Sequence, residues 1–233
     1  MSQPPHFSWG RNSSCYSGGE SWYNDPATRI KLKVYRPILL ICRRFGITPN
    51  MITLAGLFFG TAAGCALAFG YLWTTFVLLL IHVVLDGIDG TLAKFVDNSS
   101  IQGSVFDISS DMISVFFLVV GLVHLNLLDS ILALWFIFVY LSIVVFSIVR
   151  NVFNRPYKNM LRPRYELYLV FVLYLFFGID IFDISVLIFN IIMTVTFVTG
   201  LAVVLSCLGE VGVPSRGEGA HNPSTSDTEQ PHT

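Results

Sequence analysis

Six apolar segments that follow one another between residues 51 and 208 restrict the fold of this chain more than any other feature. Hydrophobic residues make up 54% of the 233-residue sequence and charged residues only 12%, which excludes an ordinary soluble domain. A helix needs about 20 residues to cross a bilayer, and only the fifth segment falls clearly short, at about 15. The segments are residues 51–71, 73–89, 103–125, 128–149, 165–179 and 184–207.

Basic residues are distributed unevenly between these segments and predict their orientation. They gather in residues 29–44, before the first segment, and in residues 150–164, between the fourth and the fifth, while Lys94 lies between the second and the third. The turns at the other ends of the segments contain no Lys or Arg. Because cytosolic loops of membrane proteins carry an excess of Lys and Arg, this alternation predicts six spans with both termini in the cytosol.

The stretches that flank the apolar segments differ from them in composition. Residues 25–46 mix cations with apolar residues, which is typical of an amphipathic helix in the membrane interface, and Pro26 suits the first helical position. A solvated basic linker is the alternative. Residues 1–24 and 209–233 are polar and rich in Ser, Gly and Pro, and we expect both to be disordered tails. The sequence therefore predicts an all-α integral membrane protein whose membrane domain covers residues 25–208.

Four aspartates lie within the second and third apolar segments, where a charge at the bilayer centre costs about 2.5–3.5 kcal/mol. Asp86 and Asp89 are three residues apart and Asp107 and Asp111 four apart, so each pair shares one face of a helix. The polar stretch 96–100 can reverse the chain and bring both pairs to the same depth. Four carboxylates repel one another unless cations lie between them. Oxygen ligands suit Mg²⁺, Mn²⁺ or Ca²⁺ rather than zinc, so we predict a divalent-metal site.

Small residues accompany the aspartates. Gly90 and Gly103 leave no side chain beside the carboxylates, and Ala93 is small, so a ligand could approach closely. Lys94 adds a cation, and the combination indicates a site for a diphosphate. His82, one turn before Asp86, either orients that carboxylate or packs against a neighbouring helix.

The segment from Asp86 to Asp111 resembles the signature of the CDP-alcohol phosphotransferase family, D-x2-D-G-x2-A-R-x8-G-x3-D-x3-D. Every fixed position matches except one, where Lys94 replaces arginine. At average residue usage, the matched positions have a chance probability on the order of 10⁻⁹ per starting point. The stretch from Thr48 to Gly56 also resembles the segment that enters the first span in this family.

The resemblance implies an enzyme that transfers a phosphate-linked group from a CDP-alcohol to the hydroxyl of a second alcohol and releases CMP. It implies six spans, an interfacial N-terminal helix and a homodimer. Two divalent ions, Mg²⁺ or Mn²⁺, would be held by the four aspartates, and Asp111 would also be the catalytic base. Lys94 would face phosphate, keeping the charge of arginine but not its bidentate fork. The remaining nucleotide-binding positions implied by the resemblance are Gly90, Ala93 and Gly103.

The sequence constrains the identity of the donor and of the acceptor less than it constrains the type of reaction. CDP-diacylglycerol suits a membrane site as the donor, because its acyl chains can stay in lipid while the nucleotide reaches a cytosolic pocket. Arg150 and Arg155 could hold the phosphate of an anionic acceptor, such as glycerol 3-phosphate or an inositol phosphate, although the positive-inside rule alone would also place cations there. Inositol or serine would be the next candidates. No nucleic-acid partner is expected.

A membrane transporter for cations or protons is the alternative function, because acidic residues inside membrane segments also mark ion pathways. Transporters commonly place charged or broken-helix features in both halves of the chain. Here the acidic residues inside the apolar segments belong to one cluster, which favours the enzyme.

Overall fold

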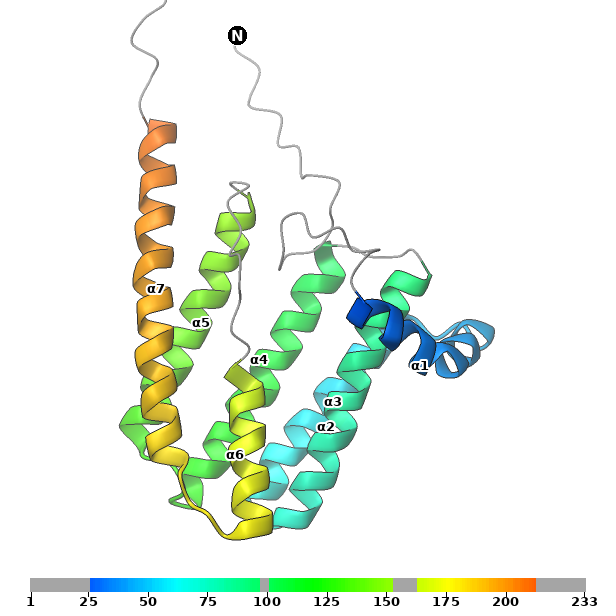
Figure 1. The fold of residues 1–233 in the computed structure, drawn as a ribbon, viewed down its shortest axis with the longest axis horizontal. Helices are drawn as coiled ribbons and strands as arrows, with labels where there is room; N and C mark the ends of the chain where they lie inside the picture. Colours follow the sequence, from blue (N-terminus) through cyan, green and yellow to red (C-terminus); the bar gives the residue numbers. More distant parts are fainter. Residues whose placement is uncertain (1–25, 97–100, 153–162, 213–233) are drawn as a thin grey trace, which may run out of the picture.

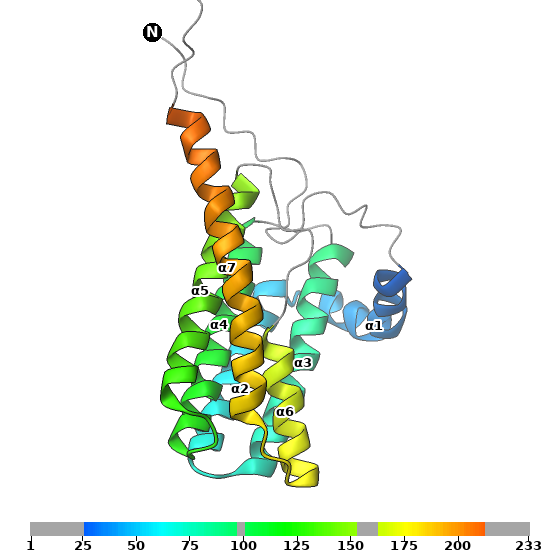
Figure 2. The same ribbon diagram turned by 60° about the vertical axis from the view of Figure 1, so that its left-hand side comes forward.

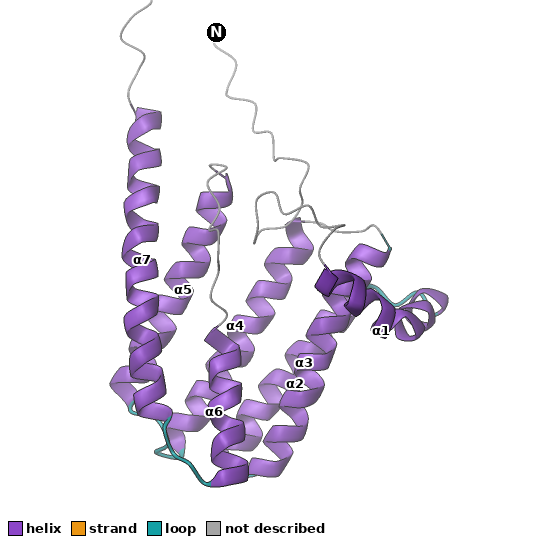
Figure 3. Cartoon of the chain, viewed as in Figure 1, coloured by secondary structure: helices purple, strands orange, loops and turns teal. Residues whose placement is uncertain are grey.

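The computed structural model describes residues 26–96, 101–152 and 163–212, and these residues form seven α-helices (Figures 1 and 3). Within the described ranges no strand occurs, which confirms the prediction of an all-α fold. The helices are α1 (Pro26–Arg44), α2 (Pro49–Ala68), α3 (Leu72–Phe95), α4 (Ile101–His124), α5 (Ser130–Val152), α6 (Pro163–Phe177) and α7 (Phe182–Gly212).

Five of these helices, α2, α3, α4, α5 and α7, are long and apolar enough to cross a membrane, so the chain is an integral membrane protein. Helix α6 corresponds to the fifth predicted span but has 15 residues. At 1.5 Å per residue it is about 22 Å long, less than the hydrocarbon layer of about 30 Å. The count of six spans therefore stays a prediction.

The helices form two groups, joined by contacts of α4 with α5 and of α6 with both α3 and α7. In the first group α2 packs against both α3 and α4, and in the second α5 packs against α7 (Figures 1 and 2). Helix α3 ends and α4 begins at the same end of the bundle, the upper end in Figure 1. Helix α6 starts only partway down from that end, below the tips of α4 and α5 (Figures 1 and 2). Its first residues therefore lie within the bundle.

Helix α2 approaches α4 backbone to backbone along a stripe of glycines. A Cβ atom added at Gly60 would overlap the side chain of Ser114, and one added at Gly64 would overlap the backbone of Phe117. From the other side, a Cβ at Gly121 would lie 2.8 Å from the carbonyl oxygen of Gly64. Small residues that allow such close approach are common between membrane helices. The contact fixes the position of α4, which carries two of the four aspartates, relative to α2.

Helix α1 lies beside the α2–α4 group, outside the bundle (Figures 1 and 2). Its buried residues Leu39 and Cys42 form a small core with Ile52 of α2 and with Ile88 and Leu92 of α3. The helix thus forms within the predicted range 25–46, while its placement in the membrane interface stays a prediction.

Helix α7, with 31 residues, extends past α5 at the upper end of the bundle (Figures 1 and 2). It continues to Gly212, whereas the last predicted span and the membrane domain end at residues 207 and 208. The predicted N-terminal tail, residues 1–24, lies outside the described residues. So do residues 213–233 of the predicted C-terminal tail.

Candidate metal centre

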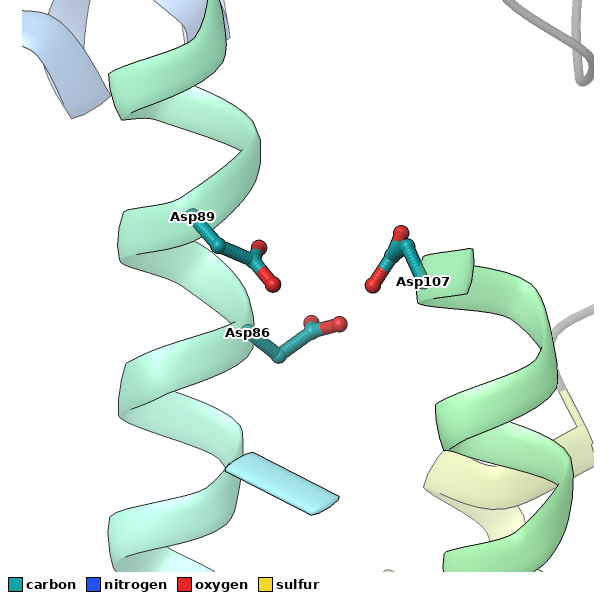
Figure 4. A group of neighbouring side chains, drawn as sticks. All are labelled: Asp86, Asp89 and Asp107. Atoms are coloured by element: carbon teal, nitrogen blue, oxygen red, sulfur yellow. The ribbon is translucent and has the colours of Figure 1, made fainter. Parts of the chain in front are cut away.

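Three of the four aspartates converge between α3 and α4. Asp86 and Asp89 lie one turn apart on α3, and Asp107 faces them from the first turns of α4 (Figure 4). Each offers one carboxylate oxygen, and these oxygens lie within 4.8 Å of one another. Asp89 is buried, and the other two are half-buried. Three anionic oxygens at this spacing fit part of the shell of a hard divalent cation, so these residues could hold Mg²⁺ or Mn²⁺.

Asp111, predicted as the fourth ligand and as the base, stands outside this group of three. It is buried on α4, where its Oδ2 forms an ion pair with Nη1 of Arg164 from α6. Nη2 of the same guanidinium lies 3.0 Å from Oδ2 of Asp86. Arg164 therefore joins Asp111 to the metal-ligand candidate Asp86.

Arg164 reaches this position because α6 starts within the bundle. It is the second residue of α6, follows Pro163, and has its guanidinium carbon 4.9 Å from the ring centroid of Tyr165. A buried arginine in a membrane protein needs acidic partners, and the two aspartates supply them. From the sequence, Arg164 was predicted only as part of the basic stretch 150–164 and not as a residue of the site. The available signal was that it directly precedes the shortest apolar segment, which at about 15 residues is shorter than the usual span of about 20.

Asp89 is held by neighbours from two helices. Its Oδ2 accepts a hydrogen bond of 2.7 Å from the hydroxyl of Thr53 on α2, and its Oδ1 lies 2.5 Å from the backbone nitrogen of Gly90. Thr53 was not among the predicted site residues, since nothing in its local pattern indicates a partner 36 residues away.

His82 contacts α2 rather than Asp86. Its Nδ1 lies 2.9 Å from the carbonyl oxygen of Gly56, which can only accept, so Nδ1 is the donor. Its Nε2 is 4.0 Å from Oδ1 of Asp111, beyond hydrogen-bonding distance, and its ring meets that of Tyr168 edge to face. The geometry favours the interpretation of His82 as a residue that packs α3 against its neighbours.

The predicted nucleotide-binding residues lie near the three aspartates in sequence and differ in exposure. A Cβ atom added at Gly90 would meet nothing within 4 Å, so space is open beside Asp89. Ala93 and Lys94 follow on the last turns of α3, and Gly103 precedes Asp107 by one turn on α4; all three are half-buried. Their nucleotide contacts stay predictions.

Of the two predicted acceptor-binding residues, one lies in the described part of the chain and one does not. Arg150 is half-buried in the last turn of α5. Arg155 lies outside the described residues.

Replacing Arg164 with glutamine should destabilise the protein when divalent metal is absent. Removing one partner of a buried ion pair typically costs about 3–5 kcal/mol, because the remaining charge stays buried without compensation. We expect a lower thermal midpoint for Arg164→Gln in chelator, and a partial recovery on addition of Mn²⁺, which can compensate the same carboxylates. The control is Arg43→Gln, at an exposed position on α1. Equal midpoints for the two variants would show that the pairing with Asp86 and Asp111 does not stabilise the fold.

Known proteins resemble this chain in sequence and in fold. Residues 46–206 match the family model described as CDP-alcohol phosphatidyltransferase. Inner membrane protein YnjF of Escherichia coli is 37% identical over 82 residues, which cover 34% of this chain and 39% of YnjF, so the match spans about two fifths of that relative.

Two crystal structures of phosphatidylinositol phosphate synthase from Mycobacterium tuberculosis share the fold. The complex with manganese and citrate has a TM-score of 0.62 at 19% identity, covering 79% of this chain and 95% of that chain. The apo form has a TM-score of 0.54 at 20% identity, covering 76% and 100%.

Proposed function

This chain belongs to the CDP-alcohol phosphatidyltransferase family, and on that premise we propose that it transfers a phosphatidyl group from CDP-diacylglycerol to a small polar alcohol, releasing CMP. The family match confirms the resemblance carried by the segment from Asp86 to Asp111. One observation carries the proposal for this chain: the three carboxylates of Asp86, Asp89 and Asp107 meet where the family signature lies, at one end of α3 and α4. A transporter is not needed to explain the acidic cluster.

The proposed reaction is an in-line displacement at the β-phosphorus of the donor. Asp111 accepts the proton of the acceptor hydroxyl, the alcohol oxygen forms a bond to phosphorus, and the bond from phosphorus to the CMP oxygen breaks, with its electron pair leaving on CMP. Asp86, Asp89 and Asp107 would hold the divalent metal, which when bound would neutralise the diphosphate and stabilise the leaving group. Arg164 would hold Asp111 and Asp86 at a fixed separation in this process.

A count of formal charges supports two metal ions in the loaded site. The four aspartates contribute four negative charges when ionised, and Arg164 contributes one positive charge. The donor diphosphate adds about two more negative charges. One divalent ion would leave a large negative excess at a partly buried site, whereas two would bring the total close to neutral. We therefore propose two ions, Mg²⁺ or Mn²⁺.

The surroundings of the aspartates support a lipid-linked nucleotide donor. The site lies at one end of apolar helices, so acyl chains of the donor could remain in the bilayer. The open space beside Gly90 would admit the nucleotide, and Lys94, one turn further along α3, would contact its phosphates.

An anionic acceptor, such as glycerol 3-phosphate or an inositol phosphate, is our first proposal, with Arg150 and Arg155 as the residues that hold its phosphate. We further propose a homodimer with six spans, α1 in the membrane interface, and both termini and the site in the cytosol.

A transfer assay tests the proposed function. Purified protein with CDP-diacylglycerol and Mn²⁺ should release CMP only when an alcohol acceptor is added, and we expect the highest rate with a phosphorylated alcohol. The panel contains glycerol 3-phosphate, inositol phosphate, inositol and serine, with product lipids identified by mass spectrometry. No CMP release with any alcohol would refute the transferase. Use of inositol or serine alone would keep the transferase but refute the acceptor role of Arg150 and Arg155.

A further inference from the structure

We propose that Thr53 is a positioning residue of the metal centre, whose hydroxyl fixes the Asp89 carboxylate in the orientation that binds the metal. The inference rests on the proposed function, because it assigns a role at the same metal site. It concerns a residue on α2, a helix that contributes no carboxylate to the centre.

The two hydrogen bonds of Asp89 fix its carboxylate group. The Thr53 hydroxyl donates to Oδ2 over 2.7 Å, and Oδ1 lies 2.5 Å from the backbone nitrogen of Gly90. With one donor at each oxygen, rotation about the bond that carries the carboxylate would break both contacts. Each carboxylate oxygen can accept more than one bond, so both retain a lone pair for a metal ion. A buried ligand held in this way does not need to reorganise when the metal binds.

Thr53 also lies where α2, α3 and α4 meet. It is buried, and its carbonyl oxygen is 3.4 Å from the hydroxyl of Ser110 on α4, next to Asp111 and three residues after Asp107. Its side chain thus contacts an aspartate of α3, and its backbone contacts the part of α4 that carries the other two. A single residue therefore links the three helices at the level of the carboxylates.

The hydroxyl of Thr53 is directed at Asp89 although a partner within its own helix is available. The carbonyl oxygen of Pro49 lies 3.2 Å from Oγ1, a longer contact than the 2.7 Å to Asp89. A hydroxyl has one hydrogen, and a bond to a carboxylate is stronger than one to a neutral carbonyl. Thr61, two turns along the same helix, donates within its own helix, to the carbonyls of Leu57 and Phe58, and to no carboxylate in the described part of the chain. Thr61 is therefore a matched control for a threonine on α2 without a carboxylate partner.

Binding of Mn²⁺ alone, measured by calorimetry on purified protein in detergent, tests the role without requiring substrate. Loss of a hydrogen bond to a metal ligand typically weakens metal affinity by about 10–100-fold, and we expect this for Thr53→Val. Thr53→Ser keeps the hydroxyl and should bind Mn²⁺ nearly as tightly as the wild type. Thr61→Val should also bind like the wild type.

The outcomes separate the possible explanations. Unchanged affinity in Thr53→Val would overturn the inference, and so would equal losses in Thr53→Val and Thr53→Ser, which would point to the methyl group and its packing. Thermal midpoints in chelator and gel filtration show whether Thr53→Val is folded; if it is not, the comparison of Thr53→Ser with Thr53→Ala decides. Absence of Mn²⁺ binding in the wild type would instead refute the metal-dependent function proposed above.

Discussion

Chelation of divalent metal should reduce CMP release by the purified protein to the background rate. The carboxylates of Asp86, Asp89 and Asp107 lie within 4.8 Å of one another, and a diphosphate cannot join them without added positive charge. Metal also supplies the stabilisation of the leaving group, so the loss should be complete rather than partial. The measurement is the initial rate of CMP release from CDP-diacylglycerol before and after EDTA.

Adding Mg²⁺ or Mn²⁺ in excess over EDTA should restore the rate, which excludes damage by the chelator. The restored rates for the two ions would identify the better cofactor. Turnover that is undiminished in EDTA would refute the assignment of the three aspartates as a catalytic metal centre.

The second large effect is expected for Asp111→Asn. The amide cannot accept the proton of the acceptor hydroxyl, and loss of a general base typically lowers turnover by about 10²–10⁴-fold. In the structure Asp111 stands outside the group of three carboxylates and pairs with Arg164. We therefore expect Mn²⁺ affinity to change much less than turnover. The two measurements are the rate of CMP release at saturating substrates and Mn²⁺ binding by calorimetry.

The matched variant is Asp89→Asn, which removes a carboxylate from the group of three. It should weaken Mn²⁺ binding and lower turnover together. If Asp111→Asn behaved in the same way, Asp111 would be a metal ligand rather than a base alone. Near-normal turnover in Asp111→Asn would require another base.

The elements and the aspartate pairs could be predicted because their signals are local. Apolar length and composition gave the fourth segment as 128–149, and α5 spans Ser130–Val152. Asp86 and Asp89 share a helix face by spacing alone, and the predicted reversal of the chain between the second and third segments accounts for Asp107 facing them (Figure 4).

Contacts between distant segments could not be predicted in the same way. The hydrogen bond from Thr53 to Asp89 and the ion pairs of Arg164 depend on how far each helix is displaced along its neighbours. Spacing within a helix does not contain this information. The close approach of α2 and α4 is an intermediate case, since the spacing of Gly60 and Gly64 was visible in the sequence and is common at helix contacts in membranes.

The late start of α6 has a consequence for the biogenesis of the protein. Helix α6 has only 15 residues and carries a buried arginine in its first turn, so by itself it is a poor membrane segment that needs acidic partners for that arginine. Synthesis from the N-terminus delivers α3 and α4 first, and with them the carboxylates of Asp86 and Asp111. The carboxylates that pair with Arg164 are therefore synthesised before Arg164 itself. We expect α6 to enter the membrane together with α7, as a helical hairpin.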